Sequence, residues 1–186
     1  MNLSKQNIYL VGAMGSGKTT IGRLIAKELG LDFQDCDQEL EQITGASVNL
    51  IFDVEGEQGF RLRETQLLKS MSKLEGVVIA TGGGVVSRLE NRKILCSNGL
   101  VIWLKTTVQQ QINRLSQDKS RPLLQTPDRE ETLQRLAEIR NPLYREVSDL
   151  QFTSPNKNTK YSAHTLCKLI RNHQDSGSGG EIRAQN

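Results

Sequence analysis

The amino-acid sequence predicts an α/β fold, in which a mostly parallel sheet is covered by helices on both faces. Residues 77–80 and 100–104 are nearly continuous apolar runs, which is typical of strands buried on both faces. Segments with helical spacing follow such runs, and this alternation favours parallel strands joined by right-handed crossovers. Aromatic residues make up only 4% of the chain, so Leu, Ile, Val and Ala must build the core, as suits such a sheet.

Five strands are expected, each a short β-prone or apolar run: residues 8–11, 31–35, 77–80, 100–104 and 150–152. Helices are expected where apolar residues recur every three or four positions: around residues 21–29, 40–43, 57–72, 94–95, 109–115, 130–140 and 163–170. Gly30 follows the first helix as a C-terminal cap would. In such a sheet, ligands bind beyond the carboxyl ends of the strands.

The length of the chain indicates one domain, which we expect over residues 1–172. Polar residues and a proline occupy residues 116–126 between two expected helices, and this segment is the natural candidate for a mobile lid. Residues 173–186 have the composition of a linker and are expected to be a disordered tail.

Charge and cysteine content exclude several classes of protein. The chain has 24 Lys and Arg against 21 Asp and Glu, and a net charge of +3 argues against an obligate nucleic-acid partner. No apolar run reaches the roughly 18 residues that span a bilayer, and no signal-like segment is present, so no membrane partner is expected. Cys36, Cys96 and Cys167 are odd in number and widely spaced, which favours free thiols in a reducing compartment. A cytoplasmic protein is the simplest expectation.

Residues 12–19, GAMGSGKT, fit the phosphate-loop pattern G-x-x-x-x-G-K-[ST] between an expected strand and an expected helix. Glycines let successive backbone N–H groups face a polyphosphate, and the start of the helix adds partial positive charge. Lys18 is expected to reach the β- and γ-phosphates, and the Thr19 hydroxyl to bind Mg²⁺. A glycine-rich turn without a ligand is the alternative, which Lys and Thr in register disfavour. The motif predicts binding of ATP or GTP.

Asp35 and Asp37 end the second expected strand, where residues i and i+2 point the same way. One carboxylate could serve the metal while the other hydrogen-bonds an acceptor hydroxyl, the arrangement that phosphoryl transfer requires. Turn formation, or helix capping by Asp37, explains the pair equally well.

Three arginines supply positive charge to complement the carboxylates of the candidate site. Arg61 and Glu64 lie three residues apart on an expected helix, so that Glu64 can orient the guanidinium. Arg140 is expected at the end of another helix, shortly before Pro142. Two arginines at one pocket would suit an acceptor that carries a carboxylate, which guanidinium groups bind. Arg121, in the candidate lid, is placed to neutralise charge on the phosphoryl group during its transfer. Solvated surface charge is the alternative for Arg61 and Arg140, and an ordinary loop arginine is the alternative for Arg121.

Three glycines at 82–84 follow a buried strand, where other phosphate-loop proteins often carry a metal-binding aspartate. Here backbone N–H groups could replace side chains, although a tight turn is the alternative. His164 and His173 are isolated near the C-terminus and are expected at the surface.

Six segments together closely resemble the shikimate kinase family in order and spacing: GAMGSGKTT at 12–20, DCD at 35–37, FRLRE at 60–64, GGG at 82–84, RPLL at 121–124 and RNPLYRE at 140–146. The resemblance extends over residues 5–171. It implies a three-layer P-loop kinase fold, with a five-stranded parallel sheet and a mobile lid. It also implies that a monomer transfers the γ-phosphate of ATP to the 3-hydroxyl of shikimate, in chorismate and aromatic amino acid biosynthesis.

By position, the resemblance assigns a role to each matching residue. The implied phosphate-binding residues are Gly15, Ser16, Gly17, Lys18, Thr19 and Thr20. The implied Mg²⁺ ligands are Thr19 and, through water, Asp35. The implied shikimate-binding residues are Asp37, Arg61, Gly83 and Arg140. The implied catalytic residues are Lys18, Asp37 as candidate base, and Arg121, and the implied ATP contacts outside the loop are Arg121 and Lys157.

Cys36 departs from the family, which usually has a small hydroxyl residue there, and is expected to add a thiol sensitive to oxidation. Two other functions compete with shikimate phosphorylation. A sister kinase acting on gluconate or a nucleoside monophosphate is disfavoured by Asp37, Arg61 and Arg140, because a nucleotide acceptor also needs a base-recognition surface. A non-catalytic ATP-binding module is disfavoured because such a protein would be expected to lose its acceptor-binding residues, and they are present in this sequence.

Overall fold

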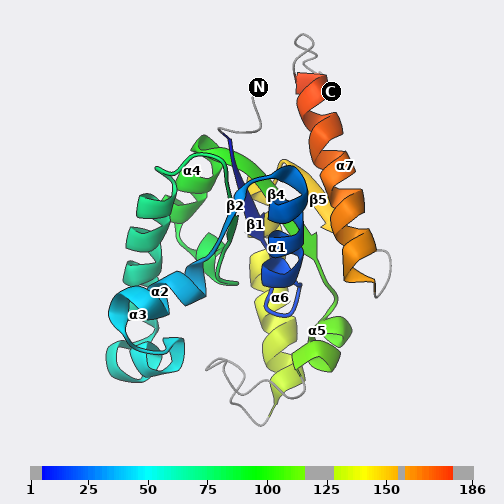
Figure 1. The fold of residues 1–186 in the computed structure, drawn as a ribbon. Coiled ribbons are helices and arrows are strands. Elements are labelled where there is room, and N and C mark those ends of the chain that lie inside the picture. Colours follow the sequence, from blue (N-terminus) through cyan, green and yellow to red (C-terminus); the bar gives the residue numbers. More distant parts are fainter. Residues whose placement is uncertain (1–5, 116–127, 155–157, 178–186) are drawn as a thin grey trace.

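The computed structural model describes residues 6–115, 128–154 and 158–177 (Figure 1). Its five strands form one parallel sheet in the order β2-β3-β1-β4-β5. The strands are β1 (Asn7–Val11), β2 (Asp32–Asp35), β3 (Val77–Ala80), β4 (Gly99–Lys105) and β5 (Leu150–Thr153). The prediction of a five-stranded parallel sheet is therefore confirmed, with strand ends within a residue or two of the expected ones.

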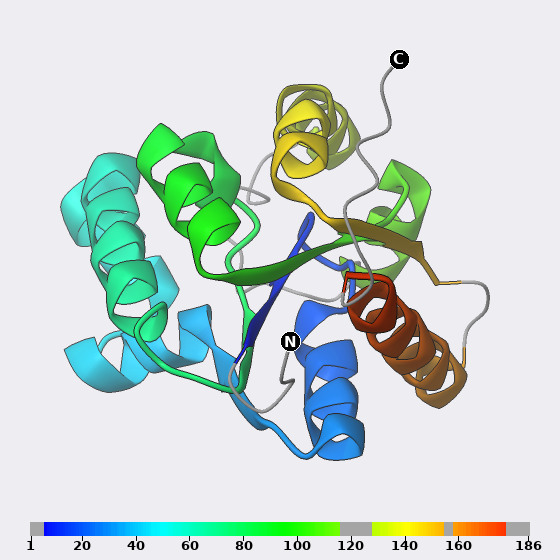
Figure 2. The same ribbon diagram turned by 90° about the horizontal axis from the view of Figure 1, so that it is seen from above.

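Helices cover both faces of the sheet, as Figure 2 shows from above. They are α1 (Lys18–Leu29), α2 (Cys36–Thr44), α3 (Val48–Met71), α4 (Leu89–Ser97), α5 (Val108–Leu115), α6 (Arg129–Val147) and α7 (Thr159–Gly177), with a short 3₁₀ helix η1 (Val85–Ser87). Side chains alternate along β1, so that Ile8 and Leu10 pack under α1 and α7 while Tyr9 and Val11 pack under α2, α3, α4 and α6. The expected three-layer arrangement follows from this two-sided burial.

Helix α3 begins earlier than the sequence predicts. Ser47 caps it by accepting a hydrogen bond from the Leu50 N–H, and Gly56 interrupts it with a φ of 69° and a ψ of −179°. The interruption bends the chain, so that residues on both sides of Gly56 face the same region. Apolar spacing over residues 57–72 therefore revealed only the second part of the helix.

Helix α6 continues through Pro142 to Val147, and the expectation that Arg140 ends a helix is wrong. Proline removes one backbone hydrogen bond and usually breaks a helix. Here the next turn is buried, because Tyr144 is 0% exposed and Val147 is 3% exposed in the core beneath α6. Burial of these two side chains outweighs the local cost of the proline.

Helix α7 runs to Gly177, so residues 173–177 are helical where the sequence predicts a disordered tail. Adding residues to an existing helix costs little compared with nucleating one. The Gln174 Nε2 donates to Gln6 Oε1 at 3.2 Å and ties this end to the start of the chain. The remaining tail, 178–186, lies outside the described residues, as does the candidate lid.

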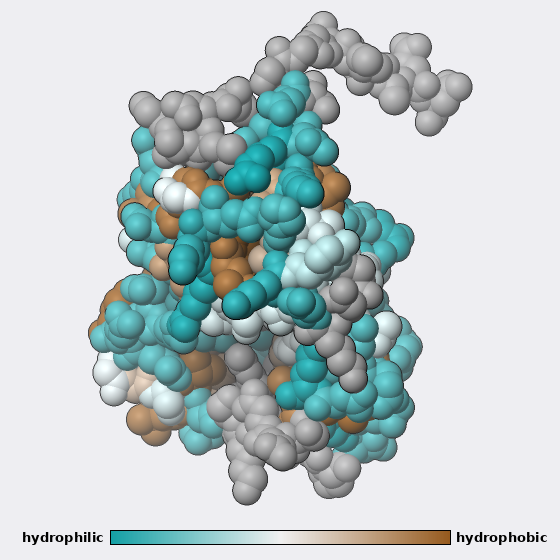
Figure 3. Space-filling model, turned by 45° about the vertical axis from the view of Figure 1, so that its right-hand side comes forward, coloured by the Kyte–Doolittle hydropathy of each residue, from teal (hydrophilic) through white to brown (hydrophobic). Residues whose placement is uncertain are grey.

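The face drawn in Figure 3 is mainly hydrophilic, with apolar residues in separate areas. Scattered apolar residues are ordinary at protein surfaces and indicate no docking face by themselves. Within the described ranges, no helix has the length and apolar character needed to cross a bilayer.

Candidate active site

The phosphate loop joins β1 to α1 and turns at three glycines. Gly12, Gly15 and Gly17 have φ values of 143°, 73° and 94°, which residues with a Cβ rarely adopt. A Cβ on Gly12 would lie 2.5 Å from the carbonyl oxygen of Leu104, so the backbone itself excludes a larger residue. Gly17 is the N-cap residue of α1, which directs the positive end of the helix dipole at the loop. The predicted strand–loop–helix context is confirmed.

The reactive side chains of the loop are held by specific contacts. The Lys18 ammonium donates to the carbonyl oxygens of Gly12 at 2.8 Å and Ala13 at 2.9 Å, so it lies over the loop. The Thr19 hydroxyl donates to Asp35 Oδ2 at 2.6 Å. Hydroxyl and carboxylate oxygens are the donors that Mg²⁺ prefers. Among the described residues there is no cluster of three or more acidic, His or Cys side chains that could hold a metal ion.

Asp35 and Asp37 do not lie on one strand as the sequence predicts. β2 ends at Asp35 and α2 begins at Cys36, so Asp37 belongs to the first turn of a helix. Asp35 Oδ1 accepts from the N–H groups of Asp37 at 3.0 Å and Gln38 at 3.4 Å and caps that helix. This capping gives hydrogen-bond acceptors to N–H groups at the start of α2, which a continued strand through Asp37 would not do. The two carboxylates therefore separate, since Asp35 faces Thr19 and Asp37 lines a neighbouring pocket.

Cys36 lies between these carboxylates but is buried. Its thiol is 3.6 Å from the Met71 sulfur, and burial raises the pKa of Cys36 well above its usual value, as do the charges of Asp37 and Glu64. A thiol in this state is a poor nucleophile and a poor target for oxidants. The expectation of an oxidation-sensitive Cys36 is therefore wrong. All three cysteines are free thiols, as predicted.

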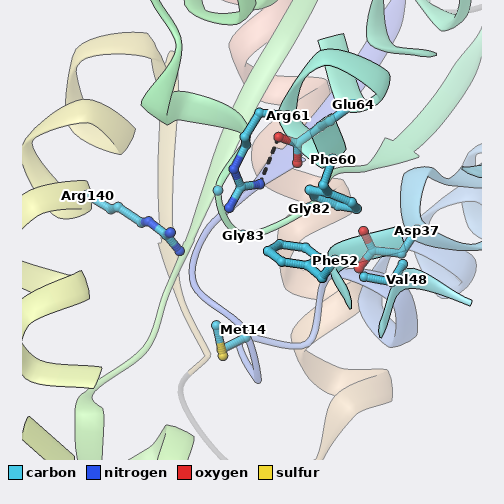
Figure 4. A pocket seen from close by; sticks show the side chains of 11 residues that line it. Met14, Asp37, Val48, Phe52, Phe60, Arg61, Glu64, Gly82, Gly83 and Arg140 are labelled. Atoms are coloured by element: carbon cyan, nitrogen blue, oxygen red, sulfur yellow. Dashed lines mark hydrogen bonds and ion pairs between the residues drawn. The ribbon is translucent and has the colours of Figure 1, made fainter. Parts of the chain in front are cut away.

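The pocket lies beside the phosphate loop and is drawn in Figure 4. Side chains line it from the loop, α2, α3 and α6, and the glycines after β3 line it with backbone atoms. The lining residues are Met14, Asp37, Val48, Phe52, Phe60, Arg61, Glu64, Gly82, Gly83, Gly84 and Arg140. Its apolar wall, which the sequence did not predict, contains the rings of Phe52 and Phe60 with centroids 4.5 Å apart. An apolar wall with a few charged groups suits a small ring carrying polar substituents.

Arg61 stands in the wall of the pocket on α3 and is 8% exposed. It donates from Nη1 to Glu64 at 2.9 Å and from Nη2 to Glu57 at 3.1 Å. Burial works against the charge, but the two carboxylates outweigh it, and the pKa of Arg61 lies above its usual value. Arg61 thus stays charged and fixed. The predicted pairing with Glu64 is confirmed.

Arg140 reaches the pocket from α6, opposite the side where Asp37 lies (Figure 4). It is 7% exposed, and burial lowers the pKa of Arg140, with the charge of Arg61 acting in the same direction. Within the described residues, no carboxylate forms a salt bridge with Arg140. A carboxylate that entered the pocket would supply the missing partner, and guanidinium groups bind carboxylates through paired hydrogen bonds.

The triple glycine makes room for the pair of Arg61 and Glu64. A Cβ on Gly84 would overlap the Arg61 guanidinium, and one on Gly82 would lie 2.5 Å from Glu64 Oε1. Glu64 is 4% exposed, and burial raises the pKa of Glu64 even though Arg61 lowers it. Glu64 Oε1 has no hydrogen-bond partner in the described part of the chain. The pocket therefore contains a buried acceptor that a ligand hydroxyl or a water molecule would satisfy.

The structure brings together most of the residues singled out in the sequence. Ser16 is buried in the loop, Thr20 is exposed in the first turn of α1, and Gly83 lies against the loop at Met14, where a Cβ would be 3.3 Å from the backbone nitrogen. Arg121 and Lys157 lie outside the described residues, so their assigned roles stay predictions. Tyr144 was missed as a pocket neighbour because the helix was expected to end before it.

A phosphate loop at the end of a central parallel strand, next to a pocket with an aspartate and two buried arginines, defines a P-loop kinase of a small anionic acceptor. The family model described as "Shikimate kinase" matches residues 14–171. The chain belongs to the shikimate kinase family.

Individual relatives agree with this assignment over nearly their whole length. A shikimate kinase of Shewanella sp. (strain ANA-3) is 49% identical over 166 residues, covering 89% of this chain and 97% of the relative. One of Actinobacillus pleuropneumoniae serotype 5b (strain L20) is 47% identical over 170 residues, covering 91% and 98%. The solved shikimate kinase from Acinetobacter baumannii in complex with shikimate has a TM-score of 0.89 at 43% identity, covering 92% of this chain and 96% of that one.

Proposed function

We propose that this enzyme transfers the γ-phosphoryl group of ATP to the 3-hydroxyl of shikimate, giving ADP and shikimate 3-phosphate. The observation that carries the proposal is the meeting of Asp37, Arg61 and Arg140 in one pocket beside the phosphate loop. The related protein from Acinetobacter baumannii was solved in complex with shikimate, which supports this choice of acceptor.

Each part of shikimate has a counterpart in the pocket. Its carboxylate would bind Arg140 and Arg61, its ring would lie against the wall of Phe52 and Phe60, and its hydroxyls would face Asp37 and Gly83. The buried, unpaired Glu64 Oε1 adds an acceptor for a hydroxyl or a bridging water molecule. A nucleoside monophosphate is a poorer match, since the remaining described residues that line the pocket are apolar residues and glycines, which offer no side-chain hydrogen bonds to read a base.

At the nucleotide end, the backbone of residues 15–20 would bind the phosphates of ATP. Lys18 would leave the carbonyl groups of Gly12 and Ala13 and move onto the β- and γ-phosphates. Thr19 would ligate Mg²⁺ directly and Asp35 through water, and both oxygens already lie together at 2.6 Å. When bound, Mg²⁺ neutralises charge on the phosphates.

In the transfer step, Asp37 would hold the 3-hydroxyl in line with the γ-phosphorus and accept its proton as the new P–O bond forms and the bond to ADP breaks. From the family resemblance, we propose that Arg121, in a lid over residues 116–126, neutralises charge on the transferring phosphoryl group. By the same resemblance, we propose that Lys157 contacts the adenine. We further propose that the enzyme is a monomer, that it acts in the cytoplasm, and that its partners are these two small molecules.

The test is ADP release from Mg-ATP with shikimate, with gluconate, with AMP and without an acceptor. Turnover with shikimate alone is the expected result. Turnover with gluconate or AMP at the same rate would favour a sister kinase. ATP binding without turnover on any acceptor would favour a non-catalytic binding module.

A further inference from the structure

Tyr144 connects two walls of the acceptor pocket. It lies on α6 and is 0% exposed, and its ring packs on Trp103 with centroids 5.8 Å apart. Its hydroxyl donates a hydrogen bond to the carbonyl oxygen of Gly83, a residue 61 positions away in the sequence. One buried hydroxyl thus joins the helix that carries Arg140 to the glycine turn that lines the pocket.

Tyr144 and Arg140 also lie at one cavity. The two residues are four apart on one helix, so their side chains share a face, and both line a small cavity that reaches Ala13 and Met14 of the phosphate loop. Burial raises the pKa of Tyr144, and Arg140 acts against this by its charge and by hydrogen bonding. The phenol therefore keeps its proton at neutral pH and can donate to Gly83 while it accepts from Arg140.

Arg140 needs such a partner when the pocket is empty. Arg61 is held by two carboxylates, whereas the described residues provide Arg140 with no salt bridge. The positive charge of Arg61 also repels it, because both groups are buried at the same pocket. Without a contact that holds it, the Arg140 side chain would spread over several rotamers, and ordering it again would weaken substrate binding.

We propose that Tyr144 is a positioning residue for the carboxylate of the acceptor. Its hydroxyl, fixed by the Gly83 carbonyl and by ring packing on Trp103, holds the Arg140 guanidinium in the pocket before substrate arrives. This assignment rests on the proposed function, because it takes the acceptor to be an anion that binds Arg140. Tyr144 lines the neighbouring small cavity and is not among the residues that line the acceptor pocket.

The decisive variant is Tyr144→Phe, which removes one oxygen and keeps the ring. We expect the KM for shikimate to rise about fivefold to tenfold, the effect of losing about one hydrogen bond, while kcat and the KM for ATP stay within about twofold. The matched control is Tyr9→Phe, since Tyr9 is equally buried but lies on β1. It should leave both KM values unchanged.

A double-mutant cycle separates positioning from general destabilisation. In an Arg140→Ala background, Tyr144→Phe should raise the KM for shikimate no further, because the group that it positions is gone. An equal rise in both backgrounds, or an unchanged KM in Tyr144→Phe alone, would overturn the assignment. Wild-type enzyme without shikimate turnover would instead overturn the proposed function, and this assignment with it.

A second readout does not depend on turnover. In the empty enzyme, the ¹⁵N resonance of Arg140 Nε should be sharp in wild type and in Tyr9→Phe, and should shift and broaden in Tyr144→Phe. An Arg140 resonance that is the same in all three proteins would contradict the proposal, even if Tyr144→Phe lowers the melting temperature.

Discussion

The nucleotide end and the acceptor end of the active site are built in opposite ways. One continuous segment, residues 12–19, forms the phosphate loop, and Lys18 is held by local hydrogen bonds to Gly12 and Ala13, although Thr19 reaches out to Asp35 on β2. The acceptor pocket is instead lined by residues from α2, α3, the glycine turn and α6. A local site is set by its own sequence, whereas an assembled site depends on the packing of the whole domain.

This difference predicts that a substitution at one end of the active site can impair that end and leave ligand binding at the other end unchanged. The largest effect is expected from Asp37→Asn, which should lower kcat by about 1,000-fold because it removes the proton acceptor and weakens hydroxyl positioning. Binding of ATP, measured by calorimetry, should be unchanged. Asp53→Asn, at an exposed position on α3, is the control. A variant at Asp37 with near-normal kcat would remove this residue from the mechanism.

Arg61→Met should damage both the acceptor site and the fold, because it leaves the buried Glu64 without its partner. We expect a loss of about 3 kcal/mol in the free energy of unfolding, together with a KM for shikimate raised by about 100-fold. Urea denaturation and steady-state kinetics measure the two effects.

The stability loss in Arg61→Met should depend on pH in a defined direction. Glu64 already has a raised pKa in the folded state, and removing Arg61 raises it further. The destabilisation is then fully present above that raised pKa and shrinks as the pH falls and Glu64 becomes protonated. Adding Glu64→Gln should restore stability at neutral pH without restoring the KM. A double variant that stays unstable would show that the unpaired carboxylate is not the cause.

Lys18→Met tests the nucleotide end. We expect kcat to fall by about 100-fold, since one cation that stabilises the transferring phosphoryl group is lost. Shikimate binding in the absence of ATP should remain as in wild type, because Lys18 donates to Gly12, Ala13 and Ser16 of the loop and is not among the residues that line the acceptor pocket. Weaker shikimate binding would mean that the two ends are coupled even without nucleotide.

The smallest effect is expected from Gly84→Ala, whose methyl group would displace the Arg61 guanidinium. The KM for shikimate should rise by about tenfold, with the KM for ATP unchanged, since one contact to the carboxylate is weakened. Gly45→Ala is the control, because the added methyl group would have no atoms within 4 Å, although the φ of Gly45 is positive whereas that of Gly84 is −99°. It should lower stability and leave both KM values unchanged.

The same contrast explains what could be predicted from the sequence. The strands and the phosphate loop follow from short-range patterns, and all of these were predicted within a residue or two. The sequence pattern identified Arg61 and Glu64 as a pair because they are neighbours on one helix.

The errors arose where distant contacts override a local rule. A threonine on α1 takes one oxygen of Asp35 while the other caps α2, which splits the two aspartates that an extended strand would align. The burial of Tyr144 carries α6 past Pro142. Phe52 joins the pocket only because Gly56 bends α3. No spacing rule in one sequence gives these contacts.

Recognition of the acceptor carboxylate by the two buried arginines is the central claim, and one comparison tests it directly. Measuring kcat/KM for shikimate and for its methyl ester with the wild-type enzyme isolates the charge, because the ring and hydroxyls are the same. We predict that the ester is poorer by about 100-fold or more, since a site built around a charge-assisted pair rejects the analogue that lacks it. Equal values for the two acceptors would contradict the assignment of Arg61 and Arg140 and would require another anchor for the substrate.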